Sequence, residues 1–93
     1  MKLVPSELNY DYKWTAYQGD DPKITGSPDN TLLNRNEGYE MLYFINRLAE
    51  IWKLQQKISL LKIEKMIKNH LPSNIRSQIN VKNWIYSNWK KYY

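Results

Sequence analysis

The chain has 93 residues, no cysteine and a formal net charge of +5 at pH 7. This length predicts one domain with a small interior, and the missing cysteines exclude disulfides and thiolate-held metals. No signal-peptide pattern follows Met1, and nothing approaches the ~20 apolar residues of a membrane span. We therefore expect a protein of the cytoplasm that makes no membrane contact.

The charge is divided unevenly along the chain. Residues 1–37 sum to −2, residues 38–93 sum to +7, and Glu64 is the only acidic side chain from Lys53 onward. Such asymmetry favours attraction between the C-terminal half and polyanions or an acidic protein face. A merely solubilising lysine-rich surface is the alternative.

Residues 1–36 are predicted to form an N-terminal arm. Two turn clusters lie at residues 19–22 and 26–30. Between them and the N-terminus, Tyr10, Tyr12 and Trp14 alternate with other residues as in a short β-strand. No clear second strand follows. The arm is expected to lie extended on the helices, form a hairpin, or pair with another chain.

The first helix is the strongest prediction. Asn34 is positioned as its cap and Glu37 as its third residue, close to a capping box. An apolar stripe follows at helical spacing, formed by Met41, Leu42, Ile45, Leu48, Ala49 and Trp52. Gly38, near the start, allows another segment to approach closely.

Two further helices follow the first. The stripe stops after Trp52, which predicts a break over residues 54–59 although no glycine or proline enforces one. A second helix is expected over residues 58–70, ending before Pro72. A third is expected to start near Asn80, with Asn80 as cap and Ile79 and Trp84 as a hydrophobic staple. The predicted fold is mainly α: a three-helix domain over residues 37–93 within a single overall domain.

Catalysis has little support in the sequence. His70 is the only histidine, and we interpret it as a structural residue at a helix end. Asp20, Asp21 and Asp29 match no calcium-loop spacing and are interpreted as solvated loop acids. No phosphate loop or nucleophile motif is present. We expect neither enzymatic activity, nor a cofactor, nor a metal.

The aromatic residues suggest two uses. Helical spacing places Phe44, Trp52, Trp84 and Trp89 in or near the core. The tyrosines are too numerous for so small an interior. Tyrosine, tryptophan and arginine are enriched at interface hot spots, so this surplus predicts a protein interface.

The last two helices also resemble a helix-turn-helix. The outer face of the last helix and its preceding connection offer residue types that contact phosphates and base edges. The predicted connection of about nine residues is longer than the usual turn of about 3–4 residues. A DNA- or RNA-binding regulator therefore stays as the alternative function.

Three segments resemble small uncharacterised accessory proteins of phages and prophages of enteric bacteria. They are DPKITG at residues 21–26, NEGYEMLYFIN at 36–46 and LPSNIRS at 71–77. The resemblance spans roughly residues 13–90 and carries over no site residues. It implies stoichiometric action on host machinery, as by anti-CRISPR, anti-restriction or anti-nuclease inhibitors, or a role as a small regulator. Inhibitors that mimic DNA are strongly acidic, so the basic charge argues against that mode.

The expected function is inhibition or modulation of a host protein or ribonucleoprotein complex in the bacterial cytoplasm, by protein–protein contact. The oligomeric state stays open. The candidate contact residues are Tyr43, Arg47, Lys62, Lys65, Lys68, Arg76, Lys82, Asn83, Tyr86, Lys90 and Lys91. A second candidate contact is formed by Tyr10, Tyr12, Trp14 and Tyr17.

Overall fold

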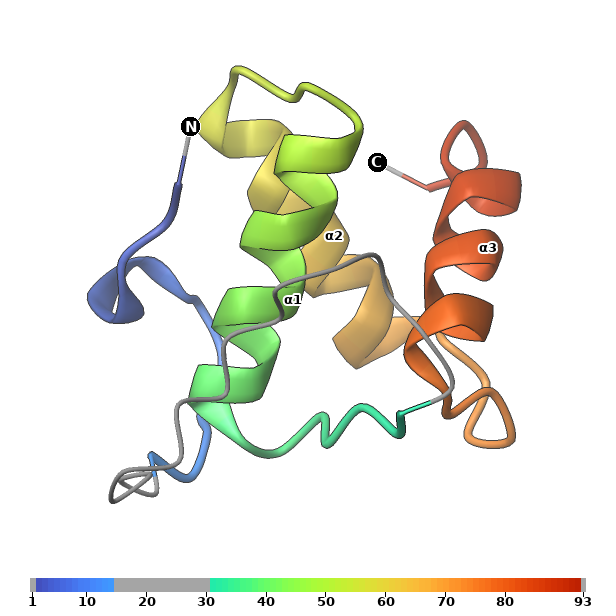
Figure 1. The fold of residues 1–93 in the computed structure, drawn as a ribbon, viewed down its shortest axis with the longest axis horizontal. Helices are drawn as coiled ribbons and strands as arrows, with labels where there is room; N and C mark the ends of the chain where they lie inside the picture. Colours follow the sequence, from blue (N-terminus) through green and yellow to red (C-terminus); the bar gives the residue numbers. More distant parts are fainter. Residues whose placement is uncertain (1, 15–30, 93) are drawn as a thin grey trace.

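A computed structural model describes residues 2–14 and 31–92, and it contains three α-helices. They are α1 (Gly38–Ile51), α2 (Lys57–Asn69) and α3 (Gln78–Asn88), preceded by a single 3₁₀ turn, η1 (Pro5–Glu7). The prediction of a mainly α, three-helix fold is confirmed. Helices α1 and α3 run in the same direction and α2 runs back between their ends, so α1 and α3 finish at the same end of the molecule (Figure 1).

The core is built from one face of each helix. The members of the predicted stripe that lie within α1 are buried together with Phe44, and they meet residues of α2 and α3 such as Leu60, Ile63 and Ile85. Trp52, Trp84 and Trp89 pack partly buried against this cluster, as expected for near-core residues.

Helix α1 starts later than its predicted cap. Glu37 is the N-cap, and its carboxylate accepts a hydrogen bond from the Tyr39 amide at 2.8 Å. Asn34, predicted as the cap, instead accepts from the Asn36 amide through its side chain and closes the turn before the helix. The expectation that Gly38 admits another segment is confirmed, since a Cβ there would lie 2.5 Å from the Trp14 ring.

A left-handed residue ends α1. Lys53 has φ 55°, and the amides of Lys53 and Leu54 donate to the carbonyls of Glu50 (3.3 Å) and Ala49 (2.8 Å). This pattern is a Schellman motif, in which glycine is the usual residue at the position of Lys53. The break predicted over residues 54–59 is therefore real, but it begins at Trp52 and ends before Lys57.

Helix α3 begins earlier than predicted. Ser77 is its N-cap, with its side chain accepting from the Asn80 amide at 3.4 Å. The predicted cap, Asn80, lies inside the first turn. A staple would then join Arg76 to Val81, so the predicted pair of Ile79 and Trp84 was wrong. The cap was missed because several serine and asparagine residues of this region are equally good capping types.

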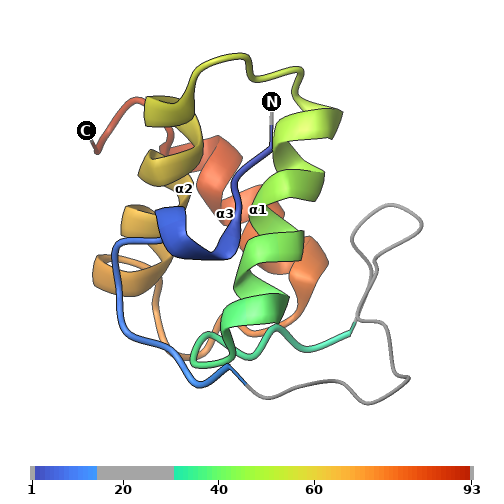
Figure 2. The same ribbon diagram turned by 90° about the vertical axis from the view of Figure 1, so that its left-hand side faces the viewer.

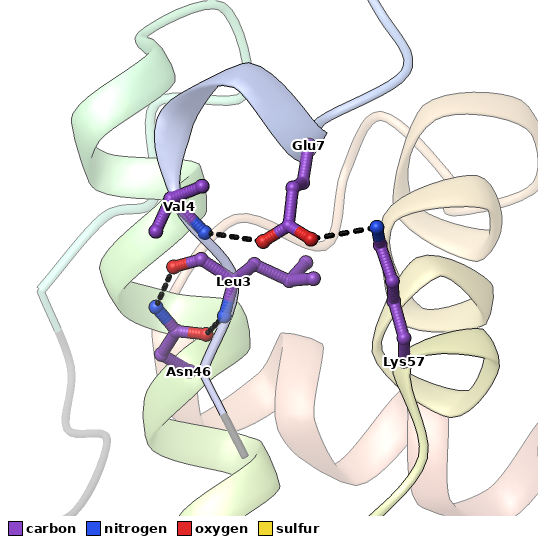
Figure 3. A network of polar contacts seen from close by, with 5 residues as sticks. All are labelled: Leu3, Val4, Glu7, Asn46 and Lys57. Atoms are coloured by element: carbon purple, nitrogen blue, oxygen red, sulfur yellow. Dashed lines mark hydrogen bonds and ion pairs between the residues drawn. The ribbon is translucent and has the colours of Figure 1, made fainter.

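The first residues of the arm are fastened to two helices. Leu3 is buried in the core, and the Asn46 side chain of α1 both donates to the Leu3 carbonyl (3.0 Å) and accepts from its amide (2.8 Å) (Figure 3). Glu7 accepts from the Val4 amide and pairs with Lys57 of α2 at 2.6 Å. Figure 2 shows the arm running across α1 and α2.

A buried carboxylate holds the next part of the arm. Glu64 of α2 is fully buried and accepts from the amides of Asn9 (3.0 Å) and Tyr10 (3.3 Å) and from the Tyr12 hydroxyl (2.6 Å). Burial, and then the hydrogen bond to Glu64, raise the pKa of the Tyr12 hydroxyl above its ordinary value. The lone acidic side chain beyond Lys53 therefore lies in the interior and not on the surface.

Residues 31–36 form a strap across the connection between α2 and α3. The Leu33 amide donates to the Arg76 carbonyl (2.9 Å), and the Gln78 amide donates to the Thr31 carbonyl (2.8 Å). The Arg35 guanidinium donates to the carbonyls of Leu71, Pro72 and Ile75. The strap thus pairs with backbone groups of the connection and with the amide of the first residue of α3.

Candidate protein-binding site

Helices α1 and α3 finish at the same end of the molecule (Figure 1). Residues at and just after these two helix ends line an aromatic groove. Its volume is about 510 Å³, and it is lined by Trp52, Leu54, Tyr86, Ser87, Trp89 and Lys90. The Schellman motif places Trp52 and Leu54 on the α1 side, and the last turn of α3 with the two residues that follow it supplies the other side. Tyr86 is 73% exposed, which is unusual for so large a ring.

The rings of this groove meet at steep angles. The Trp52 centroid lies 6.3 Å from that of Trp89 at an interplanar angle of 63°, and 6.1 Å from that of Tyr86 at 46°. The Lys62 ammonium covers one face of Trp89 at 4.1 Å and donates to the Trp89 carbonyl at 2.5 Å. Stacked bases need open ring faces in succession, whereas tilted rings form a hollow that suits an apolar side chain.

The charges around the groove are positive. Lys90 lines it, Lys62 lies over Trp89, and the exposed Lys53 separates Trp52 from Leu54. Two helix C-termini each contribute about half a negative charge there, which three lysines outweigh. None of the groove's described lining residues is acidic. Glu50, one turn before Lys53, pairs with Arg47 at 3.0 Å.

The predicted lysines of α2 serve different purposes. Lys62 holds the end of α3 through Trp89. Lys68 donates to the Arg35 carbonyl at 3.1 Å and lies over the Tyr12 ring at 4.7 Å, so it holds the strap and the arm. Lys65 is exposed on the same helix. Lys62 and Lys68 thus join segments of this chain.

Only some of the remaining predicted contact residues belong to the groove. Tyr86 and Lys90 line it, whereas Asn83 lies in a separate shallow hollow along α3 and the partly exposed Lys82 lies outside the groove lining. Arg76 donates to the Ser73 carbonyl at 3.2 Å beside the strap.

Two other parts of the first predicted surface lie elsewhere. Tyr43 and Arg47 are on α1, where Tyr43 stacks on Tyr39 with centroids 6.5 Å apart. Lys91 follows α3, and its ammonium lies 5.6 Å from the Tyr92 ring centroid. Tyr92 in turn stacks on His70 at 3.9 Å, in keeping with a structural use of that histidine.

The aromatic residues of the arm chiefly contact the helices on which the arm lies. Besides the Tyr12 contact with Glu64, the Tyr10 hydroxyl accepts from Asn69 at 2.6 Å. Trp14 is 39% exposed and meets Tyr39 edge-on at 5.1 Å. Tyr17 lies outside the described residues.

The connection between α2 and α3 differs from that of a helix-turn-helix. Residues 70–77 join α2 to α3, and the strap pairs with the connection and with the first residue of α3. In a helix-turn-helix, the N-terminal residues of the second helix contact base edges. Here Gln78 is buried at that position.

Within residues 2–14 and 31–92, no group of three or more His, Cys, Asp or Glu side chains could hold a metal ion. Across the same residues, no helix combines the length and apolar character needed to cross a membrane.

Comparisons with protein-family models, curated proteins and solved structures find no match to this chain.

Proposed function

We propose that this chain is a small, non-catalytic binding protein of the phage accessory type, which inhibits or modulates a host protein complex in the bacterial cytoplasm. The aromatic groove is its contact site. The resemblance of three sequence segments to phage and prophage proteins supports the class, and the groove supports binding to a protein.

One observation carries the proposal: the exposed Tyr86 stands beside Trp52 and Trp89 in a hollow flanked by lysines. Clustered aromatic residues that fill or border a pocket are the usual energetic centre of a protein interface. Steep ring angles favour an inserted side chain over stacked bases.

The test is affinity purification from an enterobacterial lysate after nuclease treatment, using the full chain as bait. We expect wild type to retain a stoichiometric protein partner, Tyr86→Ala to lose it, and Tyr43→Ala to keep it. Tyr43 is a fair comparison because it is a partly exposed tyrosine outside the groove. Equal recovery by wild type and Tyr86→Ala, with both folded by circular dichroism, would contradict the proposal.

A second candidate function is binding to nucleic-acid phosphates. The specific observation in its favour is that the lone acidic side chain beyond Lys53 is buried, which leaves this part of the surface without an acidic side chain. Titration with duplex DNA at varied salt tests it, since log affinity would fall linearly with log salt. Absence of binding at about 50 mM salt would remove this candidate.

A further inference from the structure

We infer that the aromatic groove binds an acidic peptide segment of its partner, with one apolar side chain of that segment inserted between Trp52, Tyr86 and Trp89. This inference rests on the proposed function and specifies its ligand. The apolar anchor follows from the shape of the groove, and the acidic flanks follow from its charge.

The anchor has a defined place. The groove is concave, and it is lined on one side by Trp52 and Leu54 and on the other by Tyr86 and Trp89. Its volume of about 510 Å³ suffices for one large side chain with some adjoining backbone. Trp89 is fixed by Lys62, which bonds its carbonyl and covers its ring, so this wall is formed before a ligand arrives.

The peptide residues on either side of the inserted side chain must be acidic because the groove's surroundings are basic. Lys90 lines the groove and is exposed, and the exposed Lys53 lies in the chain between two lining residues, Trp52 and Leu54. The nearest carboxylate along α1, that of Glu50, is neutralised by Arg47. A basic segment would meet like charge, whereas an acidic one gains attraction and faster association.

Local strain supports the same site. Lys53 adopts a left-handed conformation that costs an L-residue free energy and that glycine would adopt without strain. Retained strain of this kind clusters at binding sites. Here the left-handed residue lies between Trp52 and Leu54, which both line the groove.

The experiment is an NMR titration of the full chain, following its indole N–H signals. The probe is a synthetic peptide with one leucine among glutamates. Signals of Trp52 and Trp89 should shift, while that of Trp14, at the opposite end of α1, should not. A control peptide in which glycine replaces the leucine should bind at least about tenfold more weakly than the leucine peptide. A control peptide in which lysines replace the glutamates should not bind measurably.

Variants of the chain sharpen the test. Tyr86→Ala should weaken binding about tenfold or more, and Lys90→Glu several-fold. Lys13→Glu makes the same charge change at an exposed lysine that pairs with the start of α1, and it should have little effect.

Three results would overturn the inference. They are no shift with the acidic peptide, equal binding of the lysine peptide, and tighter binding of a single-stranded oligonucleotide at the same indoles. Dilution-dependent shifts without any peptide would assign the groove to a second copy of this chain and would also overturn it. If Tyr86→Ala still abolishes partner capture while the acidic peptide is inert, only the ligand class is wrong. If Tyr86→Ala retains the partner, the proposed function fails as well.

Discussion

At the scale of single residues, Lys53 shows how a helix can end without a glycine or proline. Its positive φ completes the two Schellman hydrogen bonds to Glu50 and Ala49. The sequence indicates the break only through the lost apolar stripe, because a lysine at this position carries no stop signal.

Lys53→Gly should stabilise the protein by about 0.5–1 kcal/mol, because relief of left-handed strain exceeds the extra unfolded-state entropy of glycine. Urea unfolding measures the change. Gln55→Gly, in the same connection but without a positive φ, should be neutral or destabilising. Equal stabilisation by both substitutions would show that strain at Lys53 is not the cause.

Gly38 is the second residue whose identity is fixed by its surroundings. An added Cβ would lie 2.5, 2.5 and 2.6 Å from three Trp14 ring carbons, which is too close for any contact. We expect Gly38→Ala to cost about 1–3 kcal/mol through overpacking, although alanine is the better helix former. In a Trp14→Ala background the same change should cost nothing, and a double-mutant cycle by urea unfolding checks this. Additive effects would contradict the contact.

At the scale of elements, the helices could be predicted from sequence and the arm's attachment could not. Helical spacing of Met41, Ile45 and Leu48 determines α1 locally. Glu64, in contrast, accepts from backbone amides 54 and 55 residues away, and no short-range pattern indicates such partners. The groove escaped prediction for the same reason, since it exists only because α1 and α3 end together.

Glu64→Gln tests the attachment of the arm. The amide would turn donors toward the Asn9 and Tyr10 amides, so we expect a loss of about 1.5–3 kcal/mol. Amide exchange at Asn9 and Tyr10 should also accelerate, as followed by NMR. Glu50→Gln, at an exposed surface pair, should cost about 0–1 kcal/mol. Unchanged exchange at Asn9 and Tyr10 would count against this role of Glu64.

At the scale of the whole molecule, the Tyr12 hydroxyl should make stability fall in alkali. Its pKa is raised in the folded state, so above about pH 10 the unfolded chain releases a proton that the native chain retains. The unfolded state then binds fewer protons, and stability declines as pH rises toward the native pKa. The decline is at most about 1.4 kcal/mol per pH unit, and screening at the half-buried ring reduces it.

Thermal unfolding of wild type and Tyr12→Phe from pH 8 to 11 measures this effect. The variant should be less stable near neutrality, because it lacks the hydrogen bond to Glu64, and its stability should depend less on alkaline pH. Parallel pH curves for the two proteins would show that another group titrates instead.

The attachment of the arm to Glu64 also has a consequence for synthesis. Translation makes Tyr12 first and Glu64 52 residues later, which corresponds to about 3–10 s at about 5–20 residues per second. During that interval Tyr12 lacks its hydrogen-bond partner on α2. Tyr12 thus leaves the ribosome before the helix that holds it, and a nascent chain stalled before α2 would expose the apolar side chains of the arm to chaperones and proteases.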